Sequence, residues 1–198
     1  MSVDFQSWMR AVWMSLLEPA HMARKAIDLR IDMRSLWMGL ALIVILNVLL
    51  LALMQVISPV PDNAPPSPLT LSPWALTGVL GLFMVLMVYG TYFAGQIMDG
   101  IGDLHATLTI IVWFHAINLT LEVIQIGLIL ISPQIGLLFG MVALGALLWC
   151  FLNFINVLHE FNSLGKSFVA FVLSLFGVGV VALIILAMVG VSLSGGTI

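Results

Sequence analysis

Four polar side chains recur along one apolar stretch in the middle of the chain. His115, Asn118, Glu122 and Gln125 are spaced three, four and three residues apart, so they form one stripe on a helix face. A carboxyl group and an imidazole placed in this way could bind a polar ligand or exchange a proton with it. Because an ionised carboxylate in lipid costs at least about 2.5 kcal/mol, we expect Glu122 to face other helices, to be protonated, or both.

The next apolar stretch offers partners for this stripe. Asn153, Asn156 and Glu160 share a helix face near its end, and antiparallel packing would bring Asn153 and Asn156 nearest to the level of His115. The four residues of the stripe, together with Asn153 and Asn156, then form either a transport site or hydrogen-bonding contacts between helices. Each such contact is worth about 0.6–2 kcal/mol. We favour the second interpretation, because Glu122 has no second charge nearby.

Motifs for known catalytic chemistry are incomplete. Residues 100–103 read GxGD, which resembles the signature of intramembrane aspartyl proteases, but the preceding apolar stretch has no aspartate to share a proton. His159-Glu160 is not followed by the second histidine of an HExxH zinc motif. A single cysteine, Cys150, excludes a multi-cysteine metal site. We therefore expect a protein that is not an enzyme and has no cofactor and no metal.

The composition indicates a chain surrounded by lipid. Hydrophobic residues make up 62% of its 198 residues, and charged residues only 8%. Soluble domains have about 25% charged residues, and a soluble fold of this length could not bury so much apolar surface. The net charge of -3 offers no basic face for a nucleic acid, so no nucleic-acid partner is expected.

Hydropathy predicts an all-α membrane protein with five spans, since about 20 apolar residues cross the hydrocarbon core. Residues 1–34 precede a transmembrane domain at 35–198. The proline-rich stretch 58–68 cannot be helical and predicts a loop outside the membrane. The expected spans are about 36–57, 73–97, 107–131, 136–157 and 168–191.

The basic residues predict the orientation. Five of the six Lys and Arg residues precede the first span, and Lys166 lies between the fourth and fifth spans. Five spans place all six on one side, which the positive-inside rule makes cytoplasmic. The expected location is a bacterial inner membrane, with a cytoplasmic N-terminus and a periplasmic C-terminus.

The first 17 residues predict an amphipathic helix in the membrane interface. Phe5, Trp8 and Trp13 lie on its apolar face and would serve as anchors. The alternative is a soluble helix packed on the cytoplasmic loops. Pro19 starts a second helix, and three cations in or just after it could meet anionic head groups or act only as ordinary topogenic charges: Arg24, Lys25 and Arg30.

Three segments carry a family resemblance. They are LEPAHMARKAIDLR, GQIMDGIGDLHATLTIIVWFHAINLTLEVI and LLWCFLNFINVLHEFNSLGKSFVAFVLSLFGV. From Leu17 to Val178 the chain resembles bacterial members of the Yip1 family, with cues at Pro19, at Gly95, Gly100 and Gly102, and in the turn 153–166.

The resemblance implies five spans after a cytoplasmic N-terminal segment. Eukaryotic relatives bind Rab-type GTPases, but their long N-terminal region and their Asp-Leu-Tyr-Gly-Pro stretch are missing here. Bacterial members are mostly of unknown function.

Two functions remain open. The favoured hypothesis is a non-enzymatic membrane protein that organises lipid or partner proteins, for example as an accessory subunit of a membrane complex. Its expected partners are membrane lipids and either another membrane protein or a second copy of itself. The alternative is a small transporter or channel with a polar site around Glu122.

Overall fold

The computed structural model describes residues 4–57 and 72–188, which form seven helices and no strand. Two helices are short, α1 (Phe5–Leu17) and α2 (Pro19–Asp28). Five are long: α3 (Met33–Ile57), α4 (Pro73–Ile97), α5 (Leu104–Ile131), α6 (Pro133–His159) and α7 (Leu164–Met188). Each long helix has the length and apolar composition needed to cross a membrane, which confirms the predicted all-α membrane bundle.

Local sequence signals account for the helix boundaries. Pro73 and Pro133 occupy first positions, where a missing N–H group removes no helical hydrogen bond. Asp103 caps α5 by accepting a hydrogen bond from the Ala106 amide at 2.7 Å. α5 and α6 each begin three residues before the predicted spans. The proline-rich stretch 58–68 and residues 189–191 of the fifth predicted span lie outside the described residues.

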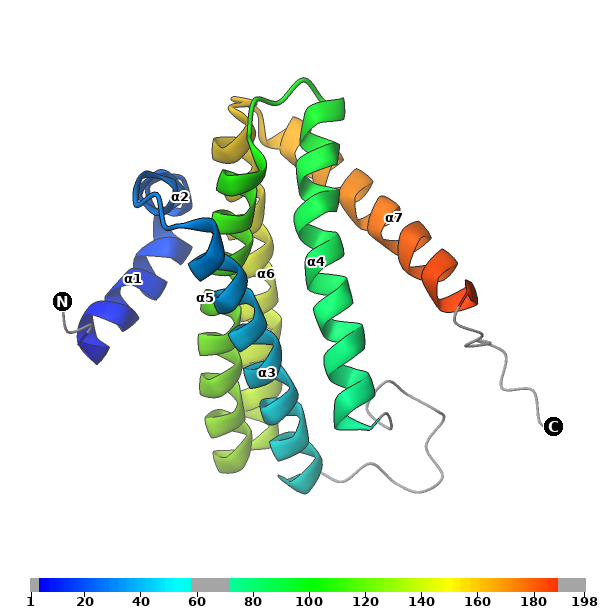
Figure 1. The fold of residues 1–198 in the computed structure, drawn as a ribbon. Helices are drawn as coiled ribbons and strands as arrows, with labels where there is room; N and C mark the ends of the chain where they lie inside the picture. The colour runs from blue at the N-terminus through cyan, green and yellow to red at the C-terminus, as the bar shows by residue number, and fades with distance from the viewer. Residues whose placement is uncertain (1–3, 58–71, 189–198) are drawn as a thin grey trace.

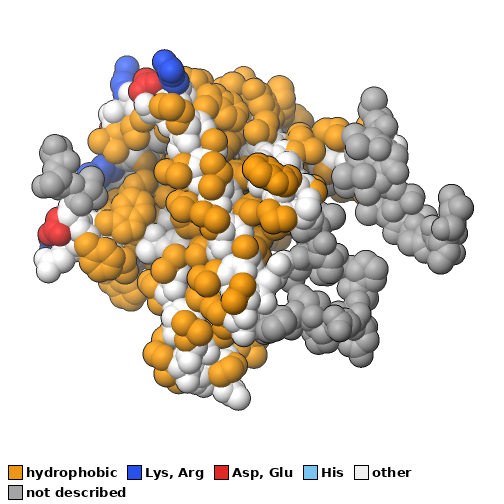
Figure 2. Space-filling view, turned by 60° about the horizontal axis from the view of Figure 1, so that its bottom comes forward, with side chains coloured by type: hydrophobic (Ala, Val, Ile, Leu, Met, Phe, Trp, Pro, Cys, Tyr) orange, Lys and Arg blue, Asp and Glu red, His pale blue; other side chains and the backbone are white. Residues whose placement is uncertain are grey.

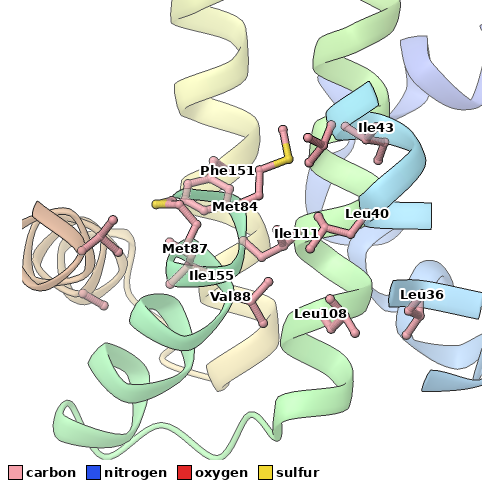
Figure 3. Packing of buried hydrophobic residues seen from close by; sticks show 13 residues of the cluster. Leu36, Leu40, Ile43, Met84, Met87, Val88, Leu108, Ile111, Phe151 and Ile155 are labelled. Atoms are coloured by element: carbon pink, nitrogen blue, oxygen red, sulfur yellow. The ribbon is translucent and has the colours of Figure 1, made fainter. Parts of the chain in front are cut away.

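α5 and α6 form the centre of the bundle, with α3 and α4 on the same side of it (Figure 1). α7 packs against α4 and α6, and its C-terminal end slants away from them (Figure 1). Between them lies a cluster of aliphatic and aromatic side chains (Figure 3). Leu40 of α3, Val88 of α4, and Ile111 of α5 are buried there beside Phe151 and Ile155 of α6. This shared core holds the long helices in register with one another.

A second buried cluster attaches the short helices to the bundle. Val12 of α1 and Ala23 of α2 pack against Ile110 of α5 and against Phe154 and Leu158 of α6. These five side chains are at most 4% exposed, so α1 and α2 belong to the folded unit.

Each of the five long helices exposes large hydrophobic side chains on the outside of the bundle. Figure 2 shows Lys and Arg side chains near one edge of a largely hydrophobic face. We call the end formed by α2 and by the turns 98–103 and 160–163 the basic end. At this end lie Arg24, Lys25, Arg30, Arg34 and Lys166.

Candidate functional site

Three of the four residues of the predicted stripe form side-chain hydrogen bonds, either within α5 or to α6. The Asn118 side-chain amide donates to a Glu122 carboxylate oxygen at 2.8 Å. The Gln125 amide donates to the Gly136 carbonyl at 3.3 Å, at the start of α6. A side chain on Gly140 would overlap with Gln125, so this glycine permits the close approach of α5 and α6.

The same stripe lines a cavity on its other side. Glu122 and Gln125 face a space of about 380 Å³ between α3, α4 and α5. Asn47 of α3 is the third polar group in its lining, and its amide donates to the Ile43 carbonyl at 2.9 Å. Leu80 of α4 is among the apolar residues that complete the walls. We call this space the Glu122 cavity. Asn47 belongs to it although it was not among the predicted site residues.

The other predicted members of the polar site lie apart from this cavity. His115 packs edge-on against Phe114, with 5.6 Å between ring centroids, and its Nε2 is buried without a hydrogen-bond partner among the described residues. Asn153 donates to the Trp149 carbonyl one turn earlier, at 2.9 Å. Asn156 accepts a hydrogen bond from the Ser163 amide at 3.0 Å and so holds the turn before α7. Neither asparagine is among the residues that line the Glu122 cavity.

The N-terminal anchors divide into two groups. Trp8 faces the bundle: its indole N–H donates to Thr120 Oγ1 at 3.2 Å, and its ring meets Trp113 at a centroid distance of 5.7 Å. Phe5 and Trp13 face outward and are 73% and 61% exposed. Three further predicted anchors are exposed at the basic end: Arg24, Lys25 and Arg30.

Ser15 connects α1 to both central helices. Its hydroxyl accepts a hydrogen bond from the Trp113 indole of α5 at 3.1 Å. Its carbonyl accepts one from the Cys150 thiol of α6 at 3.3 Å. Cys150 is fully buried at this junction. Polar contacts between apolar helices are favourable in lipid, where the alternative is an unsatisfied group.

The most closely packed site at the basic end surrounds His159, the last residue of α6. Its side chain is only 1% exposed and stacks on Phe161 at a centroid distance of 5.3 Å. Three glycines enclose the ring. A side chain on Gly95 would overlap with it, and one on Gly100 or Gly102 would come within 2.8 Å of it. The turns 98–103 and 160–163 are thereby locked together.

Sequence reasoning missed His159 as the centre of this contact. The three glycines were visible, and so was a histidine at a helix end, but about 60 residues separate them in the sequence. Only the packing of α4 against the end of α6 pairs the two segments.

One comparison with known proteins, the comparison with family models, covers almost the whole described structure. A family model described as the Yip1 domain matches residues 13–188. No curated protein and no solved structure matches the chain. The matched range includes the five long helices, α2, and both sides of the contact between His159 and its three glycines. The chain therefore belongs to the Yip1 family.

Proposed function

We propose that this integral membrane protein organises lipids or partner proteins without catalysing a reaction. The observation that carries the proposal is the two-sided α1. Trp8 and Val12 attach one face of α1 to the bundle, while Trp13 and Leu17 on another face, and Phe5 at the start of the helix, are apolar and exposed. A helix fixed in this way along the side of the bundle (Figure 1) holds its exposed aromatic side chains toward the surrounding lipid in a constant orientation.

The charges support a cytoplasmic location for the basic end in a bacterial inner membrane. Five cations gather there, and the opposite ends of the described helices contain no Lys or Arg. In this orientation the N-terminus is cytoplasmic and α7 leads the chain toward the periplasm. Anionic head groups of the cytoplasmic leaflet would attract the cations of α2.

α7 supplies a surface for a partner within the membrane. Its C-terminal end slants away from the bundle (Figure 1), and Phe176, Leu183 and Ile184 are each more than half exposed. Another membrane helix or a second copy of this chain could cover this face. A role as an accessory subunit of a larger complex accords with such a face.

Extraction of native membranes into polymer nanodiscs, followed by crosslinking and mass spectrometry, tests this proposal. We expect a reproducible partner protein or homo-oligomer, and we expect the double variant Phe5→Ala, Trp13→Ala to lose it. Trp74→Ala is the matched control, because Trp74 is 87% exposed at the other end of the molecule. Recovery of the monomer with bulk lipid alone would contradict the proposal.

The Glu122 cavity supports a second candidate function, that of a small transporter. A cavity of about 380 Å³ lined by a carboxyl group and two amides is unlike a contact that serves packing alone. If the cavity carries a substrate, Glu122→Gln should abolish substrate- or pH-driven flux in reconstituted vesicles. Glu18→Gln is the matched control, since Glu18 is exposed between α1 and α2. Flux that survives Glu122→Gln unchanged would remove Glu122 as the site.

A further inference from the structure

A separate cavity lies at the basic end, between α2 and the last turn of α6. Its volume is about 400 Å³. We call it the α2–α6 cavity. Arg24 and Asp28 of α2 line one side, and Asn156, Glu160 and Asn162 line the other. The lining is mostly polar, in contrast to the apolar groove between α4 and α7.

The charged side chains that line this cavity do not form ion pairs with one another. Arg24 and Asp28 lie one turn apart on α2, a spacing at which opposite charges often pair. Within residues 4–57 and 72–188, no ion pair joins Arg24, Asp28 or Glu160 to another residue. One guanidinium and two carboxylates therefore remain available to a ligand, and their charges sum to about -1 at neutral pH.

The α6 side of the cavity is held rigidly. Glu160 and Asn162 both have left-handed backbones, with φ of 52° and 51°, which side chains other than glycine seldom adopt. The Asn162 amide donates to the Glu160 carbonyl at 3.2 Å. Directly before Glu160, the buried His159 anchors the turn in its three-glycine enclosure. Strained backbone that the surroundings enforce in this way is typical of preformed binding sites.

We propose that the α2–α6 cavity binds the head group of a zwitterionic aminophospholipid, which joins a phosphate diester to a primary ammonium. Arg24 suits the phosphate, and Asp28 and Glu160 suit the ammonium. The asparagine amides can complete the hydrogen bonds of either group. A purely anionic head group would meet two carboxylates, which disfavour it. The inference rests on the proposed role in organising lipid and names the lipid class.

The position of the cavity favours a lipid over a soluble molecule of the same chemistry. Ile27 and Val157 form an apolar part of its wall. Ala23, on the preceding turn of α2, is buried against the apolar core of α5 and α6. The cavity thus lies where the apolar bundle surface meets its charged end, which is the level of lipid head groups in a bilayer.

Lipid retention by the full-length protein tests the proposal. The protein is exchanged into detergent with equal amounts of phosphatidylethanolamine, phosphatidylcholine and phosphatidylglycerol, and native mass spectrometry counts the lipids that remain bound. We expect preferential retention of phosphatidylethanolamine. Arg24→Ala and Glu160→Gln should each reduce it about tenfold, as loss of a charge-assisted contact does. Lys25→Ala and Glu18→Gln are the controls, because neither residue lines the cavity.

The results of this experiment distinguish lipid binding in the α2–α6 cavity from the proposed organising function. Displacement of the lipid by excess soluble glycerophosphoethanolamine would show that the head group is recognised. If that soluble compound binds as tightly as the lipid, the lipid assignment is overturned. Equal retention of all three lipids, or equal losses in the control variants, overturns the inference itself. In that case, partner capture that still depends on Phe5 and Trp13 would leave the proposed organising function standing.

Discussion

At the residue scale, His159 explains why the basic end is rigid. Its ring occupies space that side chains at Gly95, Gly100 and Gly102 would otherwise fill. Three glycines in eight residues carry an entropic disadvantage, because each loses more backbone freedom on folding than another residue would. The packed imidazole offsets it by joining the end of α4 to the end of α6.

Adding one methyl group to this contact should be strongly destabilising. Gly95→Ala would place its Cβ in the His159 ring, which is only 1% exposed and therefore has little free space to move into. We expect a loss of about 1–3 kcal/mol, the usual effect of overpacking, seen as a lower midpoint of thermal unfolding in detergent. Gly145→Ala is the control: apart from its chain neighbours and the backbone of its own helix, no atom lies within 4 Å of its Cβ position, so it should be neutral or stabilising. Equal midpoints for the two variants would show that His159 is not held as described.

Features that depend only on residues close together in the sequence could be predicted from it. The five spans follow from local apolar length, and the polar stripe follows from its spacing along a single helix. Contacts between distant segments could not be derived in this way. Asn47 lines the Glu122 cavity only because α3 packs against α5. Asn156 accepts a hydrogen bond from the Ser163 amide, and not from α5, because α6 ends close to it. No periodicity in the chain specifies which helices become neighbours.

At the element scale, some apolar residues of α1 pack against the bundle and others are exposed, and the hydrophobic pattern alone does not show which are which. Trp8 and Trp13 are both aromatic residues of α1, yet Trp8 donates a hydrogen bond to Thr120 while Trp13 is 61% exposed. Thr120 lies near the middle of α5, so α1 runs along the side of the bundle and does not only cover its end.

The two tryptophans should therefore respond differently to truncation. Trp8→Ala removes the hydrogen bond to Thr120 and the ring contact with Trp113, so we expect about 2 kcal/mol lower stability and faster proteolysis of residues 4–17. Trp13→Ala should change stability by less than about 0.5 kcal/mol, as exposed positions usually do. Limited proteolysis in detergent measures both. Release of α1 by Trp13→Ala and not by Trp8→Ala would show that the opposite face is attached.

At the scale of the whole molecule, strained backbone and positive charge gather at the same end. Among the described residues, all non-glycine positions with positive φ lie at the basic end: Arg30, Asp99, Glu160 and Asn162. The turn between α5 and α6, at the other end, has none of them. Strain of this kind persists only where surrounding packing enforces it, and it is commoner at functional sites. This asymmetry agrees with a binding surface at the basic end, as proposed above.

Single-cysteine labelling tests that orientation with little background. Cys150 is 0% exposed and its thiol donates a hydrogen bond to the Ser15 carbonyl, so the unmodified protein should not react with a membrane-impermeant maleimide. Lys25→Cys and Lys166→Cys lie at the basic end and should be labelled only after the membrane is broken. Gln134→Cys, at the start of α6, should be labelled in intact spheroplasts. Labelling of Lys25→Cys from outside would show that the orientation is the reverse of the one proposed. Opposite results for the two lysine positions would be incompatible with five crossings, because α3, α4, α5 and α6 separate them and an even number of crossings returns the chain to the same side.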